Sequence, residues 1–161
     1  MSGLRVTGCQ ELVQKLEKIG GDSRKVAQDC VKEGIGVVTD EMRARIQALK
    51  VSEQAGKKEK IRYCRQWEKD AMLKELGYTP NREIGTKEDR KAGFDGYVTS
   101  PTGKKVAVRA IANSINAGTS FMKKQPIFQP VIRSSREKAI SEMQRKLTEE
   151  LRKYGLDASG K

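Results

Sequence analysis

Histidine is absent from this sequence of 161 residues. A catalytic triad in which histidine acts as general base is therefore excluded. The three cysteines, Cys9, Cys30 and Cys64, are 21 and 34 residues apart, and the sequence contains no CxxC pair. Without histidine or closely spaced thiols, the sequence predicts no metal site. Because an odd number of cysteines is also unusual for a secreted disulfide scaffold, we expect reduced, structural thiols.

Long apolar runs are also missing. No stretch approaches the roughly 20 apolar residues that a membrane-spanning helix needs, and residues 1–12 contain no signal-peptide core. We therefore expect synthesis in a reducing cytoplasm and no membrane partner. The glycine-rich stretch 93–96 matches neither of the phosphate-binding patterns GxxxxGKS/T and GxGxxG. The sequence thus predicts no catalytic centre, cofactor or small-molecule substrate, and we expect that the protein is not an enzyme.

Aromatic residues are scarce, with three Phe, one Trp and four Tyr, whereas hydrophobic residues make up 36% of the chain and charged residues 34%. This composition favours helices with aliphatic stripes over an aromatic-rich sandwich. The length suits one domain. We expect an α+β fold in which long amphipathic helices pack on a small antiparallel sheet, with residues 1–155 as a single domain and 156–161 as a flexible tail.

Positive charge is in excess, and it is unevenly distributed. The formal net charge is +12. Residues 1–49 carry eight basic and seven acidic residues, whereas residues 50–161 carry twenty-five and fourteen. Such a field favours association either with phosphate polyanions or with an acidic protein surface, and the charge alone does not decide between them.

Hydrophobic periodicity is clearest between residues 22 and 49. An extended entry at 4–8 and a first helix precede the Gly20-Gly21 break, after which Asp22 or Ser23 is positioned to cap a longer helix. The apolar residues of this helix recur at spacings of four, three, four, four and three, and we expect them to form core. They are Val31, Ile35, Val38, Met42, Ile46 and Leu49.

Two glycines, Gly34 and Gly36, lie on the other side of the same helix. Each costs about 1 kcal/mol of helix propensity relative to alanine. Their presence indicates a close neighbour rather than open water, for which ordinary helix–helix packing is the simplest explanation.

Short elements are expected in the middle of the chain. Residues 51–60 are typical of a polar loop, and 61–76 predict a short basic helix closed by Gly77. Residues 78–85 carry turn residues and charge, and they predict a second loop.

The following segments are expected to form a strand, a turn and a helix. Residues 92–98 alternate as in a strand with a bend at its glycines, and 100–103 predict a turn. Residues 105–116 match both strand alternation and helical spacing, and we favour a helix with Gly118 as its C-cap.

Two prolines mark the last predicted change of secondary structure along the chain. Pro126 and Pro130 bracket a segment that we expect to be extended. A long terminal helix then follows, with one predicted apolar stripe. The stripe comprises Ile132, Ile140, Met143, Leu147, Leu151 and Tyr154.

Four motifs occur in a recognisable order. These are GCQELVQKL at 8–16, GFDGY at 93–97, AGTSFMKKQPIFQP at 117–130, and the amphipathic terminal helix. The order resembles a phage family of minor tail components or tail-completion proteins, in which an E-x-GTS turn and a PF-x-x-P segment lead into a C-terminal helix. The resemblance covers nearly the whole chain. Two departures are Asn116, where the family commonly has an acidic residue, and Ile127, which separates Pro126 from Phe128.

The resemblance implies a structural subunit of the neck of a tailed phage or phage-like tail particle. Such a subunit is assembled in the bacterial cytoplasm, forms a homo-oligomeric ring with a hexamer as the expected form, and is found in the virion. Its neighbours are connector, terminator or tail-tube proteins, and packaged DNA is close by. The alternative that charge leaves open is a basic DNA-associated protein of phage or host.

The segment from Gly118 to Pro130 is the candidate subunit interface, because it combines a glycine turn, apolar side chains, two lysines and two prolines. For Phe128 the alternative is that it packs in the core of its own subunit. The candidate residues are Gly118, Thr119, Ser120, Phe121, Lys123, Lys124, Pro126, Phe128 and Pro130.

Overall fold

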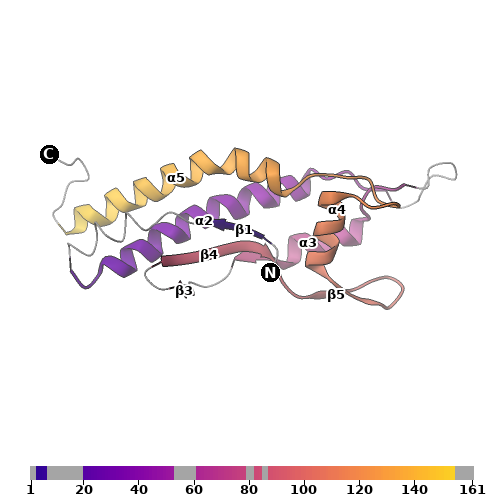
Figure 1. Cartoon of the computed structure of the whole chain (residues 1–161), viewed down its shortest axis with the longest axis horizontal. Helices are drawn as coiled ribbons and strands as arrows, with labels where there is room; N and C mark the ends of the chain where they lie inside the picture. Colours follow the sequence, from indigo (N-terminus) through magenta and orange to yellow (C-terminus); the bar gives the residue numbers. More distant parts are fainter. Residues whose placement is uncertain (1–2, 7–19, 53–60, 79–81, 85–86, 155–161) are drawn as a thin grey trace.

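A computed structural model of the chain describes residues 3–6, 20–52, 61–78, 82–84 and 87–154. The molecule is elongated, and two long helices, α2 and α5, run side by side along its length (Figure 1). Strands β1 and β4 lie along α2, while α3, α4 and the hairpin that contains β5 gather at one end. The fold is therefore α+β, as predicted. None of the helices in these ranges is both long and apolar enough to cross a membrane.

Helix α2 spans Ser23–Gln47, with Asp22 at its N-cap. All six residues of the predicted stripe are buried, which confirms that this stripe forms core. The stripe packs against residues of α3, α4 and β4, including Met72, Ile115 and Phe94. One face of α2 thus contributes to a core shared with α3, α4 and β4. The first predicted helix, before Gly20, lies outside the described residues.

The two glycines of α2 have different surroundings. A Cβ atom on Gly34 would lie 2.6 Å from the Sδ atom of Met143 and 3.7 Å from the carbonyl oxygen of Ala139, both on α5. Gly34 therefore allows the two long helices to approach closely, as predicted. A Cβ atom on Gly36 would meet no atom within 4 Å, so the expected close neighbour of Gly36 is not found within the chain.

Helix α5 spans Phe128–Lys153, but its buried face differs from the predicted stripe. Ile132 and Ile140 are 40% and 46% exposed, whereas Val131, Ser135 and Ala139 are buried. Consecutive helical residues are rotated by about 100°, so burying Val131 turns Ile132 away. The small side chains of Ser135 and Ala139 permit close approach to α2. Farther along, Leu147 and Leu151 do pack against α2.

The segment between Pro126 and Pro130 was predicted to be extended, and this prediction is wrong, because Ile127 has αR backbone angles and the next two residues already belong to a helix. Helix α5 begins at Phe128 and includes Pro130 in its first turn. The first amides of a helix have no intrahelical acceptor, so proline is tolerated there.

Strand β4 (Lys87–Phe94) is the centre of the larger sheet. It pairs antiparallel with β1 (Gly3–Val6), β2 (Leu76–Tyr78) and β3 (Arg82–Ile84). The predicted loop at 78–85 therefore contains strand residues. Gly77 lies inside β2 rather than closing a helix, because main-chain pairing with distant β4 outweighs its local preference.

The predicted strand at 92–98 is interrupted. β4 ends at Phe94, and β5 (Tyr97–Thr99) begins a separate antiparallel hairpin with β6 (Lys105–Ala107). The turn predicted at 100–103 is confirmed by a hydrogen bond of 2.8 Å from the Gly103 amide to the Ser100 carbonyl. The helix favoured for residues 105–116 is wrong for its first three residues, which form β6. Helix α4 (Val108–Ala117) follows directly and has the predicted C-cap, Gly118.

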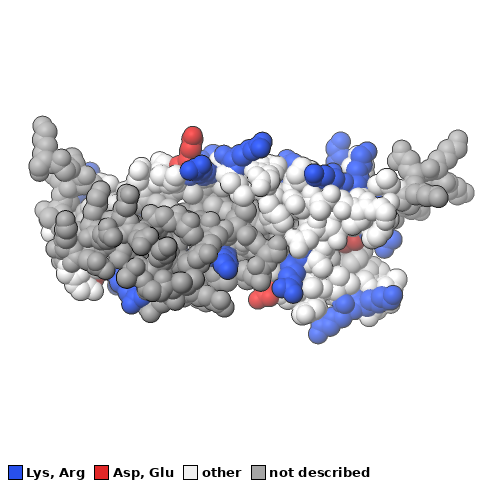
Figure 2. Space-filling view, in the orientation of Figure 1, with Lys and Arg blue, Asp and Glu red and all other residues white. Residues whose placement is uncertain are grey.

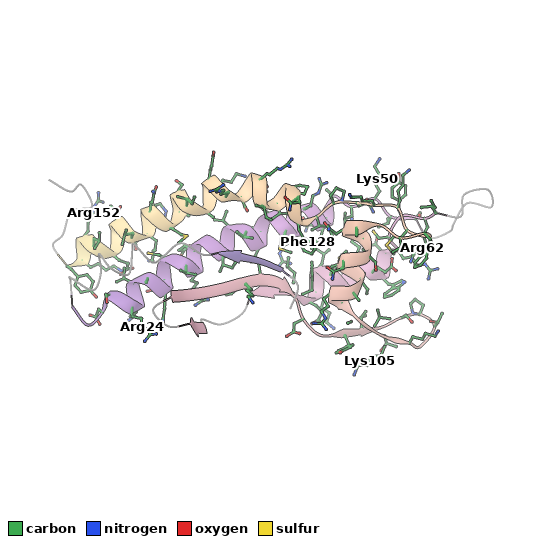
Figure 3. All side chains as sticks on the ribbon, viewed as in Figure 1. Arg24, Lys50, Arg62, Lys105, Phe128 and Arg152 are labelled. Carbon is green, nitrogen blue, oxygen red and sulfur yellow. The ribbon has the colours of Figure 1, made fainter. Side chains whose placement is uncertain are left out.

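Helix α3 spans Gln66–Glu75 and starts five residues later than predicted. Residues 61–65 are not helical, because their main chain pairs with other segments. Cys64 forms a parallel bridge with Val51, and Arg62 forms one with Met122. These two bridges bring together three segments that are distant in sequence, at the end of the molecule where Lys50 and Arg62 lie (Figure 3).

Candidate subunit interface

The candidate segment begins with a turn that requires glycine. Gly118 has a φ of 78°, and a Cβ atom there would lie 3.0 Å from Cβ of Lys124 and 3.1 Å from its amide nitrogen. Two hydrogen bonds between Thr119 and Met122 close the turn, with lengths of 2.9 and 3.3 Å. The positive φ and the close approach explain why helix α4 ends here.

Arg62 anchors this turn through its main chain. Its amide donates to the Phe121 carbonyl at 3.0 Å, and its carbonyl accepts from the Lys123 amide at 2.8 Å. Side chains alternate between the two faces of an extended segment. Phe121 and Lys123 therefore share a face with Ile61 and Tyr63, and the Lys123 ammonium lies 5.1 Å from the centre of the Tyr63 ring.

The opposite face of this pairing is buried. Met122 is 4% exposed, and the Arg62 guanidinium forms two hydrogen bonds with Glu68, of 2.9 and 2.8 Å. Glu68 also accepts from the Arg65 amide at 2.7 Å, which caps helix α3. The hydrogen bond to Glu68 raises the pKa of Arg62 above its usual value. A buried ion pair thus fixes the turn that carries Phe121 to helix α3.

Gln125 connects the turn to two further segments. Its side chain accepts from the Lys50 amide at 2.9 Å and donates to the Lys50 carbonyl at 3.0 Å. Its own amide donates to the Ile115 carbonyl at 2.8 Å. The Cys64 thiol donates to the same Lys50 carbonyl at 3.2 Å, and burial raises the pKa of this thiol. The turn is therefore held at several points rather than at one.

Asn116 supports the start of helix α5. Its side-chain oxygen accepts from the amides of Ile127 and Phe128, at 2.8 and 3.2 Å. These are among the amides that a helix start leaves without partners. Ile127, the residue inserted between Pro126 and Phe128, is fully buried. Asn116 and Ile127 therefore both have structural roles in this chain.

The candidate residues divide into two groups. Phe121 is 55% exposed, and Ser120, Lys123, Lys124 and Pro126 are exposed with it, whereas Gly118 and Thr119 are partly exposed. Phe128 is partly buried and packs against the core, and Pro130 is partly buried in the first turn of α5. The packing of Phe128 agrees with the core alternative for that residue, while Phe121 is exposed on the surface of the chain.

Three further apolar residues join Phe121 at this end. Ile61 is 48% and Val51 39% exposed, and Tyr63 is partly buried. We define the end surface as Ile61, Tyr63, Arg65, Phe121, Lys123 and Lys124. Segments 49–52, 61–65 and 118–126, which form and surround it, contain five basic and no acidic residues. The sequence pattern missed Ile61 and Tyr63, because only the pairing of Arg62 with Met122 brings them beside Phe121.

The end surface combines exposed apolar side chains with a basic rim. Among the described residues, no group of three or more Cys, Asp or Glu side chains could hold a metal ion. One side-chain polar group in these ranges, the indole N–H of Trp67, is buried without a hydrogen-bond partner. The chain matches no protein-family model, no curated protein and no solved structure.

Proposed function

We propose that the chain is a structural subunit of the neck of a tailed phage or phage-like tail particle, which joins head to tail as part of a homo-oligomeric ring. The observation that carries the proposal is the exposed Phe121 side chain on a turn fixed by Arg62 and Gln125. The motif order from residue 8 to the terminal helix supports the family. Neighbouring connector, terminator or tail-tube proteins would complete the junction within the virion.

Rigid presentation makes Phe121 suitable for assembly. Aromatic side chains are enriched in the cores of protein interfaces, and a preorganised one loses little conformational freedom on binding. Phe121 lies beside Ile61, and Lys123 and Lys124 provide a basic rim. Such a surface can close a ring when the same contact repeats by rotation.

A basic DNA-associated protein is the second candidate. Lys and Arg outnumber Asp and Glu on the visible described part of one face (Figure 2). On helix α5, however, several cations already pair with acids, as Arg145 does with Glu142 and Lys153 with Glu150. A DNA complex should weaken by about 0.9 log units per log unit of salt for each phosphate contact, whereas a ring with an apolar contact should persist. Filter binding across salt concentrations separates the two candidates.

The test of the proposal measures folding and incorporation separately. Phe121→Ala should leave the melting transition of the free subunit nearly unchanged, because the side chain is more than half exposed. It should reduce incorporation into particles, since an apolar contact worth about 1.5–3 kcal/mol is lost if Phe121 is fully buried between subunits.

A matched control is Tyr97→Ala, which removes a more exposed aromatic side chain (63%) from the β5–β6 hairpin instead. Incorporation should be retained in this variant. Labelled protein viewed by negative-stain imaging should lie at the neck of purified particles. A chain found in lysed cells and never in particles would refute the proposed role.

A further inference from the structure

Strands β5 and β6 form a hairpin that pairs with no other strand in the described part of the chain. The hairpin lies at the margin of the molecule, beside α3 and α4 (Figure 1). Its inner side is fixed, because Val98 and Val106 pack against the core. Its outer side carries Thr99, which is exposed, and Tyr97, which is 63% exposed. Such a hairpin has two edges whose main-chain groups can pair with a further strand.

The hydrogen bonds of the hairpin define which main-chain groups of β5 face outward. The Ser100 amide donates to β6 at 2.8 Å, and the Gly96 carbonyl accepts from the end of β6 at 3.2 Å. Inward-facing groups occur at every second residue of an antiparallel strand, so Val98 also faces β6. The main-chain groups of Tyr97 and Thr99 therefore face away from the hairpin. They form no hydrogen bond with any other described segment.

The two edges of the hairpin differ in their protection against pairing. Lysine on an edge strand disfavours the addition of another strand. Strand β6 begins at Lys105, directly after Lys104, and it ends at Ala107, which is the N-cap of α4. Strand β5, by contrast, has no charged side chain. The carboxylate of Asp95, which precedes this strand, accepts from the next amide at 3.0 Å. The edge of β5 is thus the one that is open to a further strand.

We infer that β5 of one copy of this chain pairs antiparallel with β5 of a second copy about a two-fold axis. The strand is self-complementary, because Val98 lies at its centre. When the two copies of Val98 lie opposite each other, Tyr97 of each copy faces Thr99 of the other. The outward main-chain groups of both residues then meet as hydrogen-bonded pairs. The contact lies apart from the end surface and goes beyond the proposed ring.

Charge and side chains favour this arrangement over the pairing of β5 with β6 of another copy. On the outer face, Tyr97 would pack beside Thr99 of the second copy, and aromatic and β-branched residues pair favourably across strands. The lysine-bearing β6 strands would lie outermost, about 14 Å apart at three strand spacings. This distance exceeds the Debye length of roughly 8 Å at physiological salt. Pairing through β6 would instead place Lys105 at the contact.

Amide hydrogen exchange at low and high protein concentration provides the first test. A contact of three residues per strand is small for a protein interface, so we expect a weak, reversible dimer of the free chain. The amides of Tyr97 and Thr99 should exchange roughly tenfold more slowly when about nine-tenths of the chain is paired, because only the unpaired fraction exchanges. The Lys105 amide, which faces outward from β6, should exchange at the same rate at both concentrations. Residue-resolved NMR measures these rates.

A proline substitution provides the second test. Thr99→Pro removes an outward amide that has no acceptor among the described residues, and edge strands tolerate proline. The melting temperature should therefore stay nearly unchanged. Dimerisation should weaken by roughly tenfold or more, since each copy loses a main-chain hydrogen bond. Sedimentation equilibrium measures this change. The matched control is Thr99→Val, which keeps the amide and the β-branched shape, and it should dimerise like the original chain.

Several results would overturn the contact. It is refuted if the original chain is monomeric at every concentration, or if exchange at Tyr97 and Thr99 does not depend on concentration. It is also refuted if folded Thr99→Pro dimerises as tightly as Thr99→Val. Slower exchange at Lys105 as well would show that β5 pairs with β6 of another copy instead. Loss of dimerisation in Phe121→Ala would place the contact at the end surface.

Discussion

The Arg62–Glu68 ion pair holds the end surface to helix α3, and loss of one partner should cost more stability than loss of both. The two side chains are only 12% and 7% exposed. Arg62→Met would leave the Glu68 carboxylate buried without its cation, although Glu68 would still accept from the Arg65 amide. Removing one partner of a buried pair typically costs about 3–5 kcal/mol, and we expect a loss of unfolding free energy in that range.

The double variant Arg62→Met/Glu68→Gln should be less destabilised than the single variant. Glutamine retains an oxygen for the Arg65 amide and carries no charge, so it preserves the cap without an unpaired carboxylate. We expect the loss to fall to about 1–2 kcal/mol, because a neutral amide left buried without its partner costs less than a charged carboxylate.

Urea unfolding followed by tryptophan fluorescence measures these losses. The chain has one tryptophan, Trp67, which precedes Glu68 in helix α3. The control is Lys138→Met, which removes an ion pair with Glu41 in which the lysine side chain is 64% exposed. The control should lose less than about 1 kcal/mol. The proposed role of the buried ion pair is refuted if Arg62→Met loses no more unfolding free energy than this control. It is also refuted if the double variant is as unstable as the single variant.

Three further predictions concern the start of helix α5, the core stripe of helix α2 and the buried Cys64 thiol. Asn116→Ala should cost about 1–2 kcal/mol in urea unfolding, because two amides at the start of α5 lose their acceptor, whereas Asn116→Asp should be at least as stable as the original chain. Equal stability of the two variants would contradict this role. Val38→Asp should abolish soluble expression, since it buries a charge in the core stripe, and a well-folded variant would mean that the stripe does not pack as described. Because burial raises the pKa of Cys64, alkylation of this thiol at pH 8 should be much slower in the folded chain than in urea, as mass spectrometry of the labelled peptide can show.

Helix α2 could be predicted because one regular pattern extends over many turns. The apolar residues of its stripe, from Val31 to Leu49, recur every three or four positions, and each of them is buried. The first and final residues also agreed with the structure within two residues, although the Asp22 side chain makes no capping hydrogen bond. Such helices are set mainly by their own periodicity, so little tertiary information is needed.

The sequence predicted the extent of helix α5 but not which of its faces is buried. Large aliphatic residues such as Ile132 and Ile140 suggested the buried face, yet the helix buries Ser135 and Ala139 instead. Close packing against Gly34 favours small side chains at that point, and this preference depends on the partner helix. The sequence of α5 alone does not contain that constraint.

Strands were harder to predict because their partners are distant. Gly77 has the local preferences of a helix end, but it pairs with Gly93 in strand β4. Residues 61–65 were assigned to a helix, although Arg62 pairs with Met122, sixty residues away. In both cases main-chain hydrogen bonds to a remote segment override the local pattern.

The same remote pairing explains what could be predicted about the candidate interface. The turn that carries Phe121 was visible because glycine, lysine and proline cluster within a few residues. Ile61 and Tyr63 were not visible, because they become neighbours of Phe121 only through the bridge between Arg62 and Met122. The local sequence around each of these residues gives no sign of the apolar surface, which forms only when the segments pair. Phe121 and Ile61 are 55% and 48% exposed, so substitutions there should change the proposed assembly before they change folding, whereas substitutions at the buried Arg62–Glu68 pair should change both.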